Sequence, residues 1–378
     1  MAWSVPISSR LALNVFRVAV ILWLLLAWDR RTRRFDSGIF LPWMCFFAIT
    51  SIASMASYDP HTSWQQMKVV ELGFAAVLVA DVVRSMRALK ILIAGLLVTS
   101  TFAAIIGLWQ SHGGTLLRAQ AFYDHYINFG EMLLLAALVS FGLLLLSWQQ
   151  ARKSHKLALA FAFSTLTLAL AATGTRTFLA ALLFGCGVVV WKQFRWRARG
   201  IFVAILVLAV FAGGWWLRSR RSMTWFEAND PGTQYRFLIW KDGLRIIGQH
   251  PLLGVGFANV QRHPERFDMA AYRTFPNMIS HFHSTPIEIA ADCGILALGV
   301  WIWLMLACWV AIKRAFEHTK ESGWFPNGSC LGALGGVAAF QVASLLHYVL
   351  GDPEPMLMFW MLIGATVFIA HRPARRPA

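Results

Sequence analysis

The sequence has little charge and few acidic residues. Only 14% of its 378 residues are charged, 58% are hydrophobic, and the mean hydropathy is +0.57. This composition excludes an ordinary soluble globular protein, in which about a quarter of the residues carry charge. Strands of alternating polar and apolar residues are also missing, which excludes an outer-membrane barrel.

The five cysteines lie in or beside apolar runs, with no spacing that predicts a disulfide or a metal site. We interpret them as small buried side chains. The sequence has no Asp-x-Asp pair and no His/Asp cluster with the spacing of metal ligands, so a metal-dependent transferase is disfavoured. No metal or other cofactor is expected.

Apolar runs of bilayer length recur along the whole chain, each about 20 residues long as a spanning helix requires. They predict an all-α fold, a polytopic membrane bundle of about eleven to twelve helices with one large periplasmic helical loop. The first run is interpreted as a retained span, because it ends in basic residues without a cleavage site. Spans are expected at 11–28, 38–56, 68–83, 89–109, 130–148, 157–173, 177–191, 200–217, 292–312, 329–349 and 356–371.

The net charge of +16 does not indicate nucleic acid, because much of it lies in short clusters between apolar runs. These clusters fall in alternate loops, which is the positive-inside pattern of an inner-membrane protein. Lipid is therefore the expected environment, and nucleic acid is not an expected partner. The clusters are Arg30, Arg31, Arg33 and Arg34; Arg84, Arg87 and Lys90; Arg152, Lys153 and Lys156; Lys192, Arg195, Arg197 and Arg199; Lys313, Arg314 and Lys320; and Arg372, Arg375 and Arg376.

This orientation divides the chain into N-terminal spans at 1–217, a large periplasmic loop at 218–291 and C-terminal spans at 292–378. The loop holds nine arginines and lysines. Between residues 233 and 249 its apolar and charged residues alternate as in an amphipathic helix, which Pro251 stops. Such a helix is expected to lie on the membrane surface or to roof a cavity between the spans. The other loops expected on this face are 57–67, 110–129, 173–176 and 350–355.

His283 is the first candidate for chemistry, because it lies where this loop re-enters the membrane. A histidine removes a proton from an alcohol near neutral pH. The alternative is an interfacial histidine that caps a helix. His281, two residues earlier, is expected to support it.

Arg176 lies in a short turn between two spans, and its planar guanidinium matches phosphate oxygens in pairs. The alternative for Arg176 is that its side chain snorkels to the membrane surface.

Arg236 opens the amphipathic helix. The alternative for this arginine is a place on a solvated helix face. Arg218, Arg220 and Arg221 follow a span directly, and contact with lipid headgroups is favoured for them.

Three pieces of the second half resemble the bacterial O-antigen ligase and polymerase superfamily of membrane glycosyltransferases. The first is Thr173-Gly174-Thr175-Arg176. The second is Arg236-x3-Trp240 followed by His250-Pro251-Leu252-Leu253-Gly254-Val255-Gly256, which otherwise predicts a tight turn. The third is His281-x-His283-Ser284, nine residues, then Gly294. Ala297 departs from the ligase pattern, which has Gly, Thr or Tyr there.

The resemblance implies that His283 is the catalytic base and that Arg176 and Arg236 bind phosphate. It implies a glycan donor on undecaprenyl diphosphate and an acceptor hydroxyl on lipid A–core, with metal-independent, inverting transfer. An O-antigen polymerase, which uses a second lipid-linked glycan as acceptor, is the nearest alternative. An oligosaccharyltransferase acting on protein hydroxyls and a lipid or solute transporter are the others. Transporters place ionisable groups at mid-bilayer, whereas these gather at the outer interface.

Overall fold

The computed structural model describes residues 9–27, 38–112, 118–194, 196, 199–200, 231–278 and 280–371. Within these ranges every regular element is a helix, which confirms the predicted all-α class. Residues 201–217 of the expected span at 200–217 lie outside them, as do Arg218, Arg220 and Arg221. The helices are α1 (Ser9–Ala27), α2 (Phe40–Met55), α3 (Pro60–Gln66), α4 (Lys68–Glu71), α5 (Phe74–Val82), α6 (Met86–His112), α7 (Tyr126–Gln150), α8 (Lys153–Ala172), α9 (Arg176–Gln193), α11 (Pro231–Gln249), α12 (Asn259–Arg262), α13 (Ala270–Thr274), α14 (Thr285–His318), α15 (Trp324–Ser344) and α16 (Pro353–Ala370), with 3-10 turns η1 (Pro264–Arg266) and η2 (Val349–Gly351).

Several of these helices suit a bilayer. Of the helices in the described ranges, α6, α7, α8, α14 and α16 are long and apolar enough to cross a membrane, and α2 is a shorter apolar helix. The fold is thus a multi-pass helical membrane bundle. The expected total of about eleven spans stays a prediction.

The core of the bundle lies around α15 and α16. Every side chain of α16 from Glu354 to Ile369 is buried, as expected of a helix with apolar residues on all sides. Helix α15 packs on α7 and α9, and glycines let the backbones approach. A Cβ added to Gly142 of α7 would lie 2.4 Å from the backbone nitrogen of Gly332 in α15.

Turns expected on one side of the membrane meet at one end of the bundle. The backbone nitrogen of Trp324, at the start of α15, donates to Gln150 Oε1 (3.0 Å), and the Trp324 ring packs against His155. Lys90 lies 5.7 Å from the centre of the Phe325 ring. The basic turns before α6, between α7 and α8 and between α14 and α15 therefore gather together, as the positive-inside pattern predicts.

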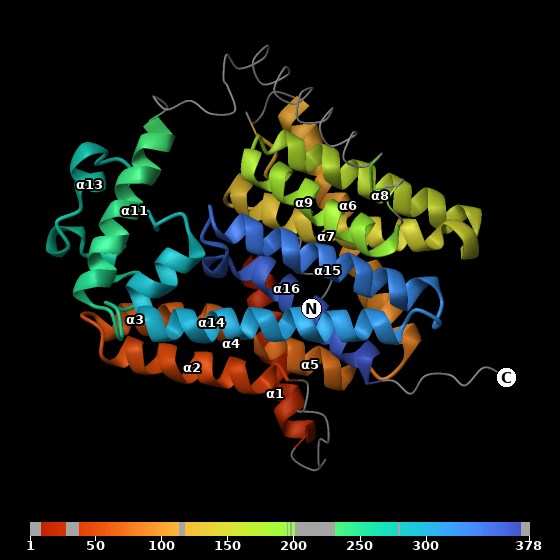
Figure 1. Ribbon diagram of the computed structural model, residues 1–378, viewed down its shortest axis with the longest axis horizontal. Coiled ribbons are helices and arrows are strands. Elements are labelled where there is room, and N and C mark those ends of the chain that lie inside the picture. The colour runs from red at the N-terminus through yellow and green to blue at the C-terminus, as the bar shows by residue number, and fades with distance from the viewer. Residues whose placement is uncertain are drawn as a thin grey trace.

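The other end carries α3 and α11–α13, on the left in Figure 1. The expected outward loop 57–67 contains α3, whose N-cap Asp59 accepts a bond from Thr62 N (3.1 Å). Tyr58 N donates to Val255 O (3.4 Å), and Arg266 lies 3.7 Å from the centre of the Tyr58 ring. Loops that the sequence assigns to one face thus contact one another.

Two boundaries differ from the prediction. The expected span at 68–83 is divided into α4 and α5. Helix α14 begins at Thr285 rather than at 292, because Pro286 occupies its first turn and the polar residues that follow are buried against protein.

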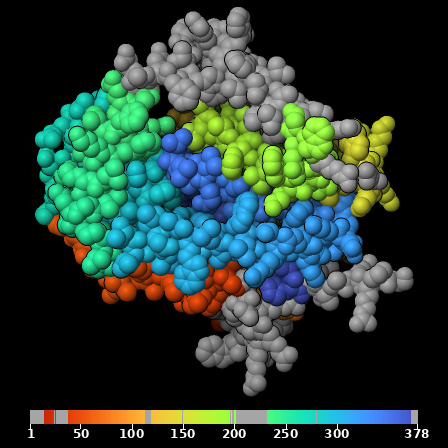
Figure 2. Space-filling view, in the orientation of Figure 1, coloured from red at the N-terminus to blue at the C-terminus, as the bar shows by residue number. Residues whose placement is uncertain are grey.

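The amphipathic helix at 233–249 corresponds to α11, which packs beside the first half of α14 (Figure 2). Its buried face includes Tyr235, Ile239 and Ile246. The pattern fails at two positions. Leu244 is exposed, while Asp242 is buried because its Oδ2 accepts a bond from Ala271 N (2.8 Å) in α13.

Candidate functional site

The segment that joins the large loop to α14 is held by hydrogen bonds to its backbone. Phe282 is buried between the two histidines; its nitrogen donates to Glu288 Oε2 (2.6 Å), and its oxygen accepts from Trp240 Nε1 (2.9 Å). His283 N donates to His281 Nδ1 (3.1 Å). With these bonds His283 adopts a left-handed φ of 52°. Such a conformation is unfavourable for a non-glycine residue and is held by its surroundings.

The ring of His283 has one engaged and one free nitrogen. Its Nε2 lies 3.1 Å from Ser280 Oγ, and the Tyr235 ring packs edge-on against it. Its Nδ1 is buried without a hydrogen-bond partner among the described residues. Burial, together with the positive charge of Arg236, lowers the pKa of His283 to about 4. The imidazole is therefore neutral at pH 7.

His283 belongs to a cluster of histidines. The rings of His281 and His283 are 4.4 Å apart, and burial lowers the pKa of His281 to about 3, with the charges of His283 and Arg236 adding to the effect. His347 packs 6.3 Å from His283. His347 is buried, and neither of its ring nitrogens has a partner in the part of the chain that the structure describes.

The two candidate arginines lie on different helices, α11 and α9. Arg236 lies in the first half of α11, one turn before Trp240, and its charge acts on both His281 and His283. Arg176 is the first residue of α9. Phe178, in the same helical turn, packs its ring 5.0 Å from His347. The structure thus brings Arg236 to the histidine pair, and it brings the start of α9 to the neighbouring His347.

The glycine-rich turn after α11 closes over the first turns of α14, where the sequence predicts that the chain doubles back. Gly256 N donates to Asp292 O (2.7 Å), and Ile295 N donates to Pro251 O (2.8 Å). The second bond replaces a helical one, because Gly294 has non-helical angles (φ 85°, ψ 169°) that break α14. Gly294 therefore lies inside this helix rather than opening it.

Sequence reasoning missed several groups at this site. Glu288 and Asp292 are buried four residues apart on α14, whereas the sequence predicts loop at Glu288 and the first residue of a span at Asp292. Nothing in the local sequence around His347 indicates its contact with His283. One signal in the sequence could have indicated these groups. Burying an ionisable side chain beside a membrane costs free energy, so such residues tend to mark functional sites.

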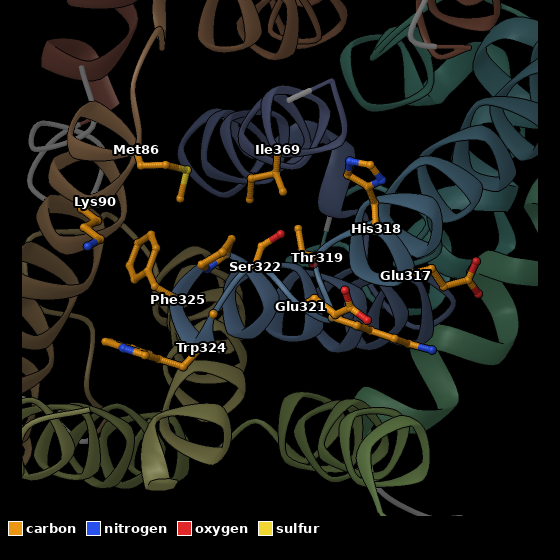
Figure 3. Close-up of a pocket in the computed structure, with 13 residues that line it drawn as sticks. Met86, Lys90, Glu317, His318, Thr319, Glu321, Ser322, Trp324, Phe325 and Ile369 are labelled. Carbon is orange, nitrogen blue, oxygen red and sulfur yellow. The ribbon is translucent and has the colours of Figure 1, made fainter. Parts of the chain in front are cut away.

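The opposite end of the bundle has a cavity of about 840 Å³ (Figure 3). Lys90 and Phe325 line it together with Glu317, His318 and Trp324. It lies among the basic turns and is separate from the histidine cluster. Within the described ranges, no group of three His, Cys, Asp or Glu residues has the geometry to hold a metal ion.

These features define a helical membrane protein with neutral histidines and an arginine at one end. Comparison with protein families matches residues 161–302 to a family described as O-antigen ligase. The match covers less than half of the chain, and it supports a relationship of this part to the O-antigen ligase and polymerase superfamily. Its members are glycosyltransferase-like ligases and polymerases, whose substrates are lipid-linked glycans in a membrane. No curated protein matches the chain. The matched range contains Arg176, Arg236, His281 and His283.

Proposed function

We propose that this protein transfers a glycan from undecaprenyl diphosphate to a sugar hydroxyl of lipid A–core, on the periplasmic face of the inner membrane. The observation that carries the proposal is a neutral His283, whose Nδ1 has no hydrogen-bond partner among the described residues and which feels the charge of Arg236. A base and a fixed cation at one point are what displacement of a diphosphate by an alcohol requires.

The hydrogen bonds around Ser280 support Nδ1 as the basic atom. We assign the hydrogen of the His283 ring to Nε2, which then donates to Ser280 Oγ (3.1 Å), while the Ser280 hydroxyl donates to His281 O (3.3 Å). A neutral imidazole carries one hydrogen. Nδ1 of His283 then keeps its lone pair and can accept a proton from a substrate hydroxyl.

In the proposed reaction Nδ1 of His283 takes the proton of the acceptor hydroxyl as its oxygen attacks the anomeric carbon. The bond between that carbon and the diphosphate oxygen breaks, and its electron pair stays on the diphosphate. One displacement inverts the anomeric configuration. Arg236 and Arg176 are proposed to stabilise the charge that develops on the leaving group, and His281 is proposed to support His283.

An O-antigen polymerase, with a second lipid-linked glycan as acceptor, would use the same base and the same arginines. An oligosaccharyltransferase would differ only in its acceptor. The deciding experiment is reconstitution of the purified protein with labelled donor and two acceptors offered separately, lipid A–core and lipid-linked repeat unit. Product on lipid A–core alone supports the ligase. Absence of turnover with either acceptor, with donor moved across the membrane instead, would establish a transporter.

The first prediction concerns Arg176. Arg176→Lys keeps the charge but loses the planar fork, so we expect kcat to fall on the order of 10²-fold, the cost of removing one donor to a developing anion. Steady-state turnover of labelled donor measures this. Arg273→Lys is the matched control, because Arg273 pairs with Asp268 (2.9 Å) on the exposed surface of α13. Full activity of Arg176→Lys would show that Arg176 does not bind the diphosphate.

The second prediction concerns pH. Protonated His283 cannot accept a proton, so activity is expected to fall as the pH drops through its pKa, which is about 4 without substrate. The diphosphate neutralises the charge of Arg236, which then no longer lowers this pKa. The acid limb of kcat/KM should therefore lie at higher pH when acceptor is limiting than when donor is limiting. Arg236→Gln should raise the donor-limited limb. The wild-type protein gives an acceptor-limited and a donor-limited profile, and Arg236→Gln gives a third. If the acid limb lay at the same pH in all three, His283 would not be the base beside the Arg236 charge.

A further inference from the structure

A small cavity of about 160 Å³ lies directly beside the histidine pair. His281 forms part of its wall, and so does Tyr348, whose ring packs 5.5 Å from that of His281. The first turns of α14 contribute Glu288 and Asp292 to the same wall. His281 also packs against the proposed base, His283, with ring centres 4.4 Å apart, so the cavity adjoins the place where the proton is taken.

The lining differs in charge from the arginine side of the site. It combines carboxyl groups with the side-chain amides of Gln66 and Gln261 and with the ring of Phe257. None of the described residues that line it is Lys or Arg. An anionic group such as a diphosphate is therefore disfavoured here. Carboxylates and amides suit the hydroxyls of a neutral sugar, and apolar rings complete a typical small-molecule site.

The polar groups of the wall are already oriented. Glu288 uses Oε2 to accept from Phe282 N (2.6 Å), and Asp292 uses Oδ2 to accept from Ala258 N (3.4 Å). Each carboxyl has a second oxygen to offer a ligand. The backbone nitrogen of His283 donates to Nδ1 of His281, so the neutral His281 ring carries its hydrogen on Nε2 and can donate it.

We propose that this cavity is the acceptor subsite and that it seats the neutral sugar ring whose hydroxyl His283 deprotonates. The inference rests on the proposed function and deepens it. The diphosphate of the donor is assigned to the arginine side of the histidine pair, and the acceptor sugar to the acidic side. The acceptor hydroxyl and the anomeric carbon then meet at the proposed base.

Kinetics give the first test. Gln66→Ala and Gln261→Ala each remove one hydrogen-bonding side chain from the wall, so each is expected to raise the KM for lipid A–core about fivefold, with the KM for donor unchanged. Gln65→Ala is the matched control, because Gln65 is exposed on the same helix as Gln66 and faces His61. An unchanged acceptor KM in both wall variants would overturn the assignment.

The second test needs no catalysis. Gln261→Cys is labelled with a maleimide, with or without core oligosaccharide or free repeat-unit oligosaccharide and without donor. Of the native cysteines, Cys45 is half-buried and Cys186, Cys293, Cys308 and Cys330 are buried, so the wild-type protein gives the background. We expect one of the two saccharides to slow labelling at least fivefold, and to leave Gln65→Cys labelling unchanged.

The outcomes separate the two proposals. Protection at Gln261→Cys without turnover of donor by the wild-type protein would keep the saccharide subsite and refute glycosyl transfer. Turnover by the wild-type protein, with no protection by either saccharide and no change in acceptor KM, would keep glycosyl transfer and refute the subsite. Protection by the repeat unit alone would support the subsite and identify a polymerase.

Discussion

His283→Ala is expected to lower transfer by about 10²–10⁴-fold, the usual contribution of a general base. The substitution removes the only ring nitrogen assigned to take the acceptor proton, while the neighbouring backbone bonds of Phe282 to Glu288 and Trp240 remain possible. The left-handed φ of 52° at position 283 is sterically open to alanine, although histidine adopts this region more often. Turnover of labelled donor in the reconstituted system measures the loss.

The control for this variant is His61→Ala, which removes an exposed imidazole from α3 at the same end of the bundle. It should keep full activity. Thermal unfolding of His283→Ala should stay close to that of the wild-type protein, so that lost activity reflects chemistry. A loss of only a few-fold, in a folded protein, would exclude His283 as the base.

Gly294→Ala is expected to unfold or aggregate the protein, or to lower its stability by several kcal/mol. A Cβ at this position would lie 1.9 Å from Leu252 O, which is backbone and cannot rotate away. The φ of 85° adds about 1–3 kcal/mol for a non-glycine residue, and overpacking typically adds about 1–3 kcal/mol more. Monodispersity in detergent and the unfolding temperature measure the effect.

Gly299→Ala provides the comparison within the same helix. A Cβ at Gly299 meets nothing within 4 Å, and alanine is favoured over glycine in a helix by about 1 kcal/mol. This variant should be as stable as the wild-type protein or slightly more so. Equal stability of the two variants would show that the turn over α14 is not packed as described.

Most helices are predictable from this sequence because apolar runs of bilayer length have few other ways to satisfy their backbone. The start of α14 is not. Glu288 and Asp292 are polar residues of a kind common in loops, yet both lie inside the helix. Their carboxyl oxygens accept hydrogen bonds from backbone nitrogens, and both residues line the small cavity. The amphipathic pattern of α11 also predicts the wrong burial for Leu244, which is exposed, and for Asp242, which is buried. At Asp242 the pattern is overridden by packing against α13, where Ala271 N donates to its carboxyl.

The candidate site was predictable in part. His281, His283 and Arg236 could be singled out because titratable groups beside a membrane are costly, and the structure brings these three together. The place of Arg176 relative to them stays a prediction, with Phe178 on His347 as its support. His347 was beyond reach, because its contact with His283 joins residues far apart in the chain and no local spacing encodes it.

The nearness of Arg236 to His283 also determines how a reaction cycle would end. After transfer the imidazole holds a proton, and only the bound lipid diphosphate screens it from the guanidinium. Once that product departs, two like charges face each other in a poorly hydrated space, and the more acidic of them gives up its proton. Discharge of the spent carrier and recovery of a neutral imidazole would then be a single coupled event, in which solvent water takes the proton that leaves His283.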